Sequence, residues 1–465
     1  METEHKEIKV TNHTSTTGNI TMKRRMFMGT AATALAAGTP CLAQERRVPS
    51  LKPARSADKG FPGGLTPQGL LKDYRYWLFD DFLPFMDKYV IDHELGGFMC
   101  AVDRDGTQVN SDKSAWYEGR GIWTYSYLYN KLDKNPKYLN TARKSVDFIM
   151  KIKPSGDERW PSSFRRDGTP IPGNADIYGD LFIANGLQEY AKAKGNERYW
   201  DQAKDILIRR MKTFDGPDYE YVVSYAVPSG STPPPIKAPS VLGHWMVIIN
   251  LTTQMLEMKP DREIEAIADR AVNAIMNRHF NPDFSLQNEV VNHDLTRNPD
   301  YAQFSYLGHA IETYWMVLYE AVRRKDRGLW DTTVQRFKRH VEVAWDDVYG
   351  GAFRALYNVD ENQWAVDKVT WLQEEILFGT LFIVEHTGDE WAKQWFAKTW
   401  TYAMEKLILK PYGFPLWASS GDRKITFVRH ASRCEHFHHP RHLMQNIISL
   451  NNIIRRGGKV SGVWG

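Results

Sequence analysis

Hydrophobic residues recur every three to four positions in one segment after another, and short runs of polar residues, glycine or proline separate these segments. This spacing places apolar side chains on one face of an α-helix. The pattern predicts twelve helices, approximately over residues 66–88, 114–132, 136–152, 176–195, 197–214, 240–258, 261–280, 307–325, 329–346, 369–388, 390–407 and 434–456.

The connections between these helices alternate between short and long. Segments 132–136, 195–197 and 325–329 are short enough for tight turns inside helical hairpins, whereas the long connections carry Gly, Pro and Asp. Length alone would allow two or three domains, but a regular succession of hairpins favours one fold. Six hairpins that close on themselves form an all-α (α/α)6 barrel. We place it at residues 66–456, between a linker at 44–65 and a C-terminal tail at 457–465.

One pattern occurs twice, each time ahead of a predicted helix. The first copy contains Gly96-Gly97-Phe98, Asp103, Lys113 and Trp116, and the second contains Gly350-Gly351-Ala352-Phe353, Asp360, Lys368 and Trp371. A glycine pair, an alternating segment and a polar turn predict a short β-hairpin across one end of the barrel.

If the even-numbered helices form the inner ring, their first turns share one end of the barrel. Polar or aromatic residues open each of these helices: Trp116 and Arg120; Asp176, Tyr178 and Asp180; His244 and Trp245; His309 and Glu312; Glu374; His438 and Arg441. Singly, each has an ordinary explanation, since His244 could be a core or capping residue and Asp176 or Asp180 could cap a helix. Together they predict one polar pocket.

Four of the 14 histidines lie in the run His436-Phe437-His438-His439-Pro440-Arg441-His442. Imidazole exchanges protons near neutral pH, so the run favours acid–base chemistry. A metal site is the alternative. Zinc sites prefer particular spacings with Cys or carboxylate ligands, however, and Arg441 would repel a cation.

The first 43 residues have the features of an export signal. Lys23-Arg24-Arg25 precedes the apolar, small-residue run 29–37, and Cys41-Leu42-Ala43 ends in a plausible cleavage site. The paired arginines predict the twin-arginine route with release after Ala43, hence a periplasmic or other extracytoplasmic location.

Charge and cysteine content exclude some classes of partner. Without residues 1–43 the chain carries 55 basic and 53 acidic residues, which gives no reason to expect a nucleic-acid partner. Only Cys100 and Cys434 remain, too few for a disulfide framework. No later segment is apolar over the length of a membrane span, so stable membrane insertion is not expected. A homodimer is compatible with the sequence.

In order along the chain, these motifs resemble those of the N-acylglucosamine 2-epimerase family, which also contains aldose–ketose isomerases and oligosaccharide 2-epimerases. The resemblance runs from about Tyr74 to Ile454. It rests on Gly96-Gly97-Phe98 with Asp103 and Gly106; Lys113-x-x-Trp116-x-x-x-Arg120; Gly308-His309-Ala310-Ile311-Glu312; Lys368-x-x-Trp371-x-Gln373-x-Glu375, with Glu374 as an alternative register; Thr387-Gly388-Asp389; and Phe437-His438-x-Pro440-Arg441. The chain departs from the family pattern at Leu307, Glu435-His436 and His439, which leaves the identity of the sugar open.

The resemblance implies inversion at C2 of a reducing sugar, or aldose–ketose isomerisation, at the polar end of the barrel. His438 would be the principal base, and His309 would return the proton or assist ring opening. Arg120 and Arg441 would hold the oxygens of the sugar, and Glu312 and Glu374 would orient histidines or hydroxyls. Trp116, Trp371 and Trp417 are candidates for stacking on the sugar ring. Further contacts with the sugar are expected from His244 and Asp180. No metal or organic cofactor is expected, because arginine can stabilise the negative charge of an enediolate.

Two other functions stay open from the sequence. A glycoside hydrolase or polysaccharide lyase could use the same barrel, with Asp176 or Asp180 opposed to Glu374 as its pair of carboxylates. A sugar-binding protein could also keep the fold without the activity.

Overall fold

The computed structural model describes residues 60–464, except for 104–105, 174, 228–230, 408–417, 421–433 and 435, and describes only the backbone of 418–420. The predicted export signal at 1–43, most of the predicted linker and Trp417 lie outside the described residues.

Each segment predicted as helical contains a helix. The first is interrupted by a π-helical turn, Trp77–Phe82, which separates α1 (Pro67–Tyr76) from α2 (Leu83–Tyr89). The others are α3 (Ala115–Lys131), α4 (Pro136–Lys151), α5 (Ile177–Lys194), α6 (Glu197–Phe214), α7 (Leu242–Met258), α8 (Arg262–Asn273, followed by a π-helical turn, Ala274–Arg278), α9 (Leu307–Arg324), α10 (Arg327–Ala344), α11 (Thr370–Thr387), α12 (Glu390–Lys406) and α14 (His438–Arg455). Short 3-10 turns lie at Pro62–Gly64, Ser224–Ala226, Pro299–Tyr301 and Gly462–Trp464.

Three of the helical hairpins turn in the same way. The first helix ends at a residue in the left-handed region, and the side chain of the next residue accepts a hydrogen bond from the first turn of the second helix. The pairs are Gly195-Asn196, Lys325-Asp326 and Gly388-Asp389. Glycine adopts this conformation without steric cost and Asn or Asp caps a helix well, so the short connections are encoded locally.

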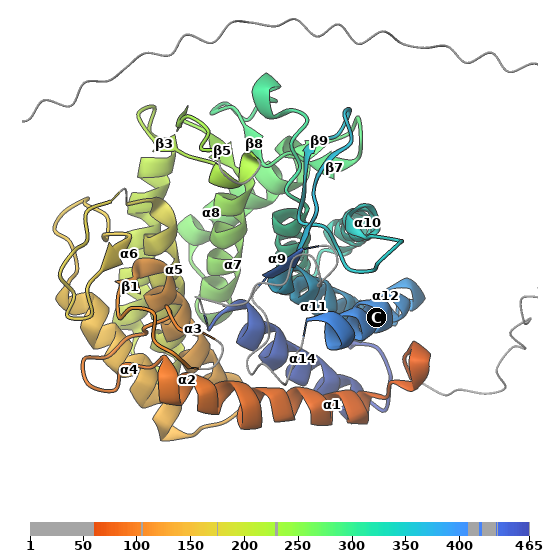
Figure 1. The fold of residues 1–465 in the computed structure, drawn as a ribbon, viewed down its shortest axis with the longest axis horizontal. Coiled ribbons are helices and arrows are strands. Elements are labelled where there is room, and N and C mark those ends of the chain that lie inside the picture. Colours follow the sequence, from red (N-terminus) through yellow and green to blue (C-terminus); the bar gives the residue numbers. More distant parts are fainter. Residues whose placement is uncertain are drawn as a thin grey trace, which may run out of the picture. The chain divides into compact units, whose positions relative to one another are not determined.

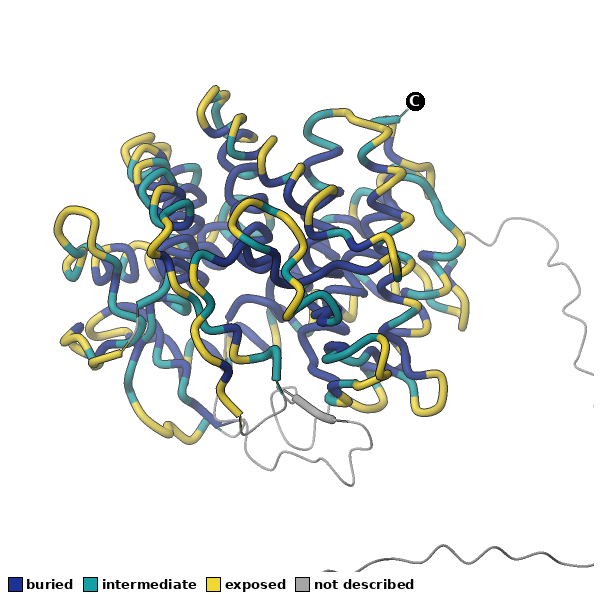
Figure 2. The backbone as a smooth tube through the Cα atoms, turned by 90° about the horizontal axis from the view of Figure 1, so that it is seen from above, coloured by how far each residue is buried: buried dark blue, intermediate teal, exposed yellow. Residues whose placement is uncertain are grey.

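The helices form two layers around one axis (Figure 1). Helices α3, α5, α7, α9, α11 and α14 contact one another in an inner ring and are buried on nearly all sides. Helices α4, α6, α8, α10 and α12 each pack on the preceding inner helix and bury one face. Helix α1 packs on α14, so the first and last helices form the sixth pair and close the (α/α)6 barrel. Figure 2 shows the resulting distribution, with buried backbone inside and exposed turns at the periphery.

Among the described residues, the strands form six short antiparallel pairs in the long connections. The pairs are β1 (Lys113–Ser114) with β2 (Ser163–Phe164), β3 (Glu220–Tyr221) with β4 (Ile236–Lys237), β5 (Ser240–Val241) with β8 (Val290–Val291), β6 (Phe280–Asn281) with β7 (Leu286–Gln287), β9 (Ala355–Asn358) with β10 (Gln363–Ala365), and β11 (Asp367–Val369) with β12 (Ala418–Ser420). The hairpin predicted for the second repeat is β9–β10. Among the described residues of the first repeat, an isolated bridge between Val102 and Gln108 takes its place.

The two sequence repeats have the same local structure, and their lysines have a structural role. Lys113 forms an ion pair with Asp92 (3.0 Å) and donates to the carbonyl of Gly96 (2.6 Å). Lys368 likewise pairs with Asp346 and donates to the carbonyl of Gly350 (2.5 Å). Each lysine therefore ties the segment before an inner helix to the turn that holds its glycine pair.

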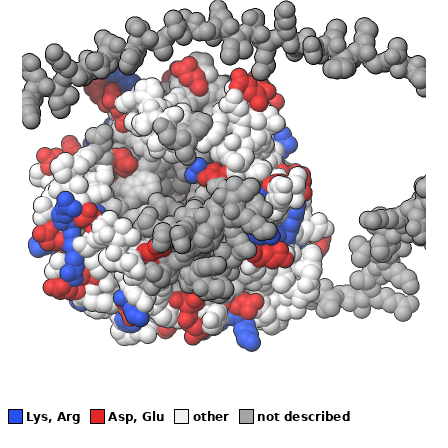
Figure 3. All heavy atoms as spheres, in the orientation of Figure 1, with Lys and Arg blue, Asp and Glu red and all other residues white. Residues whose placement is uncertain are grey.

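Residues at both ends of the described chain pack on the barrel. Phe61, in the predicted linker, lies 5.0 Å from Phe396 between ring centroids, and Trp464, in the predicted tail, lies 5.2 Å from Trp330. No described helix combines the length and the apolar character needed to cross a bilayer. Acidic and basic side chains lie mixed over the face shown in Figure 3.

Candidate functional site

Polar residues in the first two turns of α9, α11 and α14 form one hydrogen-bonded cluster. His438 Nδ1 lies 2.8 Å from Oε1 of Glu375. One helical turn along α14, Arg441 donates from Nη2 to Oε1 of Glu375 (2.5 Å) and to Oε1 of Glu312 (2.6 Å). None of these four side chains is more than 9% exposed. The cluster thus combines a histidine, an arginine and two carboxylates away from bulk water.

The charges of this cluster suit proton transfer at His438. Burial disfavours the charged guanidinium, but the carboxylates of Glu375 and Glu312 outweigh it and raise the pKa of Arg441. Two carboxylates against one arginine leave a negative surplus that stabilises an imidazolium when His438 takes up a proton. If Nδ1–H is donated to Glu375, the neutral imidazole has its lone pair on Nε2.

A second histidine–carboxylate pair lies at the start of α9. His309 Nδ1 is 2.9 Å from Oε1 of Glu289, and the same oxygen accepts the hydroxyl of Tyr225 (2.8 Å) and the backbone N–H of Gly243 (3.2 Å). Glu289 is fully buried, whereas the His309 side chain is 17% exposed. The carboxylate holds the imidazole in one orientation and again leaves the Nε2 lone pair for chemistry.

Trp371 lies close to both histidines. Its ring centroid is 5.2 Å from that of His438 and 6.3 Å from that of His309. Gly308 allows this approach, because a Cβ there would lie 2.4 Å from the indole. Both pairs therefore face the same small region beside Trp371.

Arg120 approaches this region from α3. Its guanidinium carbon lies 4.2 Å from the ring centroid of Phe182 and 4.7 Å from that of Phe437. The guanidinium carbon of Arg441 is 4.4 Å from the same Phe437 ring. Phe437 thus contacts both arginines, and their role in holding the oxygens of a substrate stays a prediction.

Glu374 contacts histidines, but not the predicted base. Its Oε1 lies 2.5 Å from Nδ1 of His439 and 3.6 Å from Nδ1 of His442. Consecutive helical residues point about 100° apart, so Glu374 and Glu375 face different neighbours. The carboxylate that contacts His438 is that of Glu375, and the role expected for Glu374 in orienting histidines or hydroxyls stays a prediction.

His436 and His442 have structural partners. The carbonyl of His436 accepts the hydroxyl of Thr124 (2.6 Å), and its Nε2 lies 2.6 Å from the carbonyl of Tyr117. His442 Nδ1 lies 2.9 Å from the carbonyl of His439, and burial lowers the pKa of His442 to about 4. These histidines hold the start of α14 in place.

His244 lies behind His309 and is fully buried. Its Nε2 is 3.1 Å from the hydroxyl of Tyr219, and its ring stacks on Tyr178 at 4.3 Å between centroids. Burial, with a smaller contribution from His309, lowers the pKa of His244 to about 3. The imidazole is therefore neutral, and its expected contact with substrate stays a prediction.

Asp180 does not join the site. Its carboxylate accepts the backbone N–H of Trp160 (3.1 Å) and lies 3.3 Å from Nε of Arg210 on the outer helix α6. Burial outweighs the effect of Arg210 and raises the pKa of Asp180 to about 7. Asp180 therefore links α5 to α6, and the expectation that it contacts a sugar is corrected.

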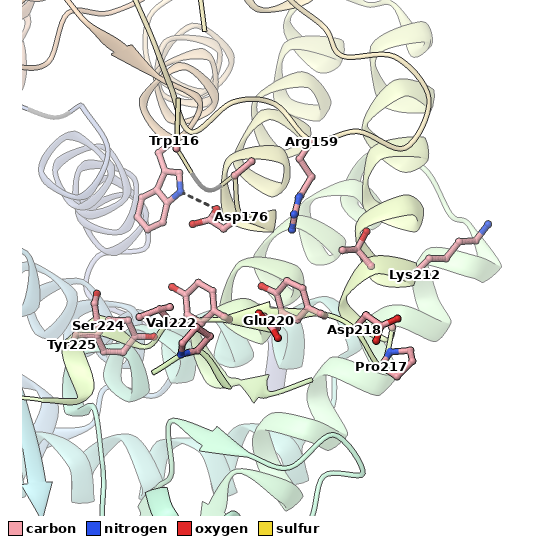
Figure 4. A pocket seen from close by; sticks show the side chains of 17 residues that line it. Trp116, Arg159, Asp176, Lys212, Pro217, Asp218, Glu220, Val222, Ser224 and Tyr225 are labelled. Carbon is pink, nitrogen blue, oxygen red and sulfur yellow. Dashed lines mark hydrogen bonds between the residues drawn. The ribbon is translucent and has the colours of Figure 1, made fainter. Parts of the chain in front are cut away.

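A pocket of about 1020 Å³ lies next to the pair formed by His309 and Glu289. Trp116, Asp176 and Arg159 lie on one side of it and face segment 217–225 on the other (Figure 4). The Trp116 indole N–H is 3.5 Å from Oδ1 of Asp176, which also caps α5. Because Tyr225 lines the pocket and binds Glu289, the pocket reaches the pair formed by Glu289 and His309.

Two groups of side chains have the donor types of a metal site. They are Glu374 with His439 and His442, and Glu312 with Glu375 and His438; within each group the potential ligand atoms lie within 4.8 Å of one another. Arg441 contacts both carboxylates of the second group and opposes a cation there. The expectation of a metal-free enzyme stays a prediction.

The sequence pattern did not identify Glu289 or Tyr225. Glu289 follows β7 in a long connection, and Tyr225 lies in a 3-10 turn between β3 and β4. Neither belongs to a helix start or a spaced motif, so no local signal marks them. Glu375 was part of the motif around Trp371. Whether Glu374 or Glu375 faces His438, however, depends on the packing of α11.

Comparisons with known proteins show the family and the fold of this chain. A model of the family N-acylglucosamine 2-epimerase (GlcNAc 2-epimerase) matches residues 96–441. The N-acylglucosamine 2-epimerase of Bos taurus is 24% identical over 387 residues, which span 78% of this chain and 87% of the bovine one. The structure of cellobiose 2-epimerase from Bacillus thermoamylovorans B4167 matches with a TM-score of 0.69 at 18% identity, over 82% of this chain and 99% of that one. A D-mannose isomerase matches with a TM-score of 0.66 at 14% identity, over 83% and 97%.

Proposed function

This chain belongs to the N-acylglucosamine 2-epimerase family and is a sugar epimerase or isomerase, and we propose that it inverts C2 of a reducing sugar by proton transfer through His438 and His309. The observation that carries the proposal is the pair of His–Glu contacts, His438 with Glu375 and His309 with Glu289, both close to Trp371.

The chemistry begins with the open-chain form of the sugar. Its C2 hydrogen lies beside the carbonyl, so a base can remove it if the enediolate oxygens are stabilised. His438 abstracts this proton through Nε2, and Glu375 stabilises the imidazolium that results. His309 enters this step as an imidazolium paired with Glu289, and it delivers the proton on its Nε2 to the opposite face of C2. If the proton is delivered to C1 instead, the same residues interconvert an aldose and a ketose, which is the alternative reaction.

The arginines supply the positive charge that the enediolate requires. Arg441 neutralises part of the negative charge of Glu312 and Glu375. The guanidinium groups of Arg120 and Arg441 both contact the ring of Phe437. Preorganised guanidinium groups in a site shielded from water stabilise a developing oxyanion strongly. His309 could instead assist ring opening, a role that the experiments below separate from proton return.

The adjoining pocket favours a substrate larger than one sugar ring. Its volume of about 1020 Å³ exceeds what a monosaccharide needs, and Trp116 and Tyr225 place aromatic rings at its inner end. Aromatic rings pack well against the apolar faces of sugars. We therefore propose a reducing disaccharide or oligosaccharide, with the reacting ring beside Trp371.

The geometry gives little support to a hydrolase. Asp176 caps α5, Asp180 is held by Arg210, and Glu374 contacts His439, so the carboxylates considered for that reaction already have structural partners. An inverting hydrolase requires two opposed carboxylates with room for a water molecule between them.

The location of the enzyme is also a proposal. The twin-arginine pattern at Lys23-Arg24-Arg25 supports export with release after Ala43. Replacement of Arg24 and Arg25 by Lys should keep the protein in the cytoplasmic fraction, whereas unchanged fractionation would contradict the twin-arginine route.

The test of the reaction uses glucose, mannose, N-acetylglucosamine and cellobiose in heavy water. We expect deuterium at C2 together with the C2 epimer, observed by NMR. His438→Ala should lower the exchange rate by roughly 10²–10⁴-fold with an unchanged circular dichroism spectrum. Retained exchange in this variant would refute the assignment of the base, new reducing ends would support a hydrolase, and binding without either reaction would indicate a sugar-binding protein.

A further inference from the structure

A second cavity lies inside the barrel at the end opposite the catalytic cluster. It has a volume of about 320 Å³ and is lined by residues of α3, α7, α9, α11 and α14. The catalytic residues occupy the first turns of the inner helices, whereas this cavity is lined by their later turns, such as Phe382 of α11 and Gln445 of α14. Eleven residues separate Trp371 from Phe382, which corresponds to about 16 Å along a helix.

Trp315 separates the cavity from the catalytic cluster. Its indole lines the cavity, its Nε1–H donates to Oε2 of Glu375 (2.6 Å), and its ring lies 5.0 Å from the guanidinium carbon of Arg441. The side chain is only 1% exposed. The cavity is therefore a distinct compartment and not an extension of the substrate pocket beside Trp116.

Gln445 contributes a side-chain amide to the wall of this cavity. The side chain is 3% exposed, and its Oε1 has no hydrogen-bond partner among the described residues. Its amide also interacts with the hydroxyl of Tyr127, another residue of the cavity wall. Ser449, one turn further along α14, adds a hydroxyl to the same wall.

The walls combine aromatic surface with amide groups. Tyr319 and Phe382 stack at 4.3 Å between centroids, and Trp315 and Tyr127 add two more rings. Asn250 and Gln445 provide amides on opposite inner helices, α7 and α14. Aromatic faces that meet C–H groups, together with amides that meet hydroxyls, match the chemistry of a sugar or another cyclic polyol.

The charged residues around the cavity favour an uncharged ligand. Arg323 is paired with Glu320 (2.7 Å), and Glu385 with Arg456 (2.9 Å). Lys131 and Glu257 line the same cavity with opposite charges. No charge of one sign predominates among the described residues of the wall, and a volume of about 320 Å³ is sufficient for one sugar ring.

We propose that this cavity is a second binding site, selective for a neutral polyol the size of one sugar ring and separate from the catalytic site. The proposal goes beyond the proposed function, because it does not require that the reaction at His438 be an epimerisation.

The test uses Met316, which lines the cavity and is 2% exposed. The full chain is labelled with 13C-methyl methionine, the Met316 signal is assigned with Met316→Leu, and methyl α-D-glucopyranoside is added. The blocked anomeric carbon of this probe prevents ring opening. We expect the Met316 signal to shift saturably in the wild type and equally in His438→Ala. Gln445→Leu and Ser449→Val should each weaken the binding at least tenfold while C2 exchange continues.

Three results would overturn the proposal. The Met316 signal does not move, the shift disappears in His438→Ala, or neither Gln445→Leu nor Ser449→Val changes the binding. Methyl β-D-glucuronide serves as the charged probe, and binding as tight as that of the neutral glucoside would contradict the selectivity. Because the readout is a resonance at Met316, failure of this proposal is distinguishable from failure of the proposed reaction, which is read at C2 of the sugar.

Discussion

His438 Nδ1 lies 2.8 Å from Oε1 of Glu375, a carboxylate from another inner helix. The contact joins the first turns of α14 and α11, and Arg441 binds the same carboxylate oxygen at 2.5 Å. This oxygen therefore holds the imidazole ring of His438 in one orientation. It also holds the guanidinium group of Arg441 beside that ring. Several expectations depend on this arrangement.

Glu375→Gln should impair catalysis far more than Glu374→Gln. The amide can still accept a hydrogen bond from His438, but it cannot stabilise the imidazolium by charge. We expect kcat to fall on the order of 100-fold in Glu375→Gln and less than about tenfold in Glu374→Gln. Steady-state kinetics of the two variants measure this difference, and thermal melting shows whether each variant is folded. Equal losses of kcat in the two variants would contradict the assignment of Glu375 as the carboxylate that serves His438.

His309→Gln should separate proton abstraction from proton return. If His438 abstracts and His309 returns the proton, the variant still exchanges deuterium into one C2 epimer but does not form the other. Glu289→Gln should show the same pattern more weakly, because Glu289 orients His309 at 2.9 Å. NMR of each pure epimer in heavy water gives both rates. Loss of exchange in both epimers would assign His309 to ring opening instead.

Trp116→Ala should raise KM more for a disaccharide than for a monosaccharide. Trp116 lines the large pocket and lies 5.0 Å from Arg120. Loss of one aromatic contact corresponds to an increase in KM of about 3- to 10-fold. We expect this increase for cellobiose and a smaller one for glucose, with Trp116→Phe close to the wild type. A uniform increase for both sugars would contradict the extended pocket.

His340 should make stability depend on pH. Burial lowers the pKa of His340 from 6.5 to about 4, so between these values the unfolded chain binds a proton that the folded chain does not. The contribution of His340 to the free energy of unfolding is therefore fully present above pH 6.5. It falls by roughly 3 kcal/mol as the pH decreases toward 4. His340→Gln keeps an acceptor for the backbone N–H of Gln287, which now binds Nε2 at 2.9 Å. Urea unfolding at pH 7 and pH 4.5 should show a smaller difference in the variant, and an equal difference would contradict the prediction.

Local features of the sequence predicted the framework of this protein. The twelve helical segments, the tight turns at Gly195-Asn196 and Lys325-Asp326, and the division into inner and outer helices follow from hydrophobic periodicity and from helix caps. The repeat of Gly-Gly and Lys also has a structural counterpart, because Lys113 and Lys368 make equivalent contacts. These interactions lie within or next to single elements, so short segments contain their cause.

The candidate site was only partly predictable from the same sequence. Arg120, His309, Glu312, His438 and Arg441 open inner helices, and the barrel brings the first turns of these helices to one end. Asp180 also opens an inner helix, yet it points outward to Arg210. Position along a helix therefore predicts the end of the barrel at which a residue lies, but not the direction of its side chain.

By itself, the sequence determined which segments become helices, how they pair, and which residue types gather at one end of the barrel. Tertiary structure alone decided which carboxylate serves which histidine. One step along a helix turns a side chain by about 100°, so the choice between Glu374 and Glu375 depends on how α11 is rotated against α14. Glu289 comes from a loop 20 residues before His309, and only the packing of that loop over α7 and α9 brings its carboxylate to the imidazole.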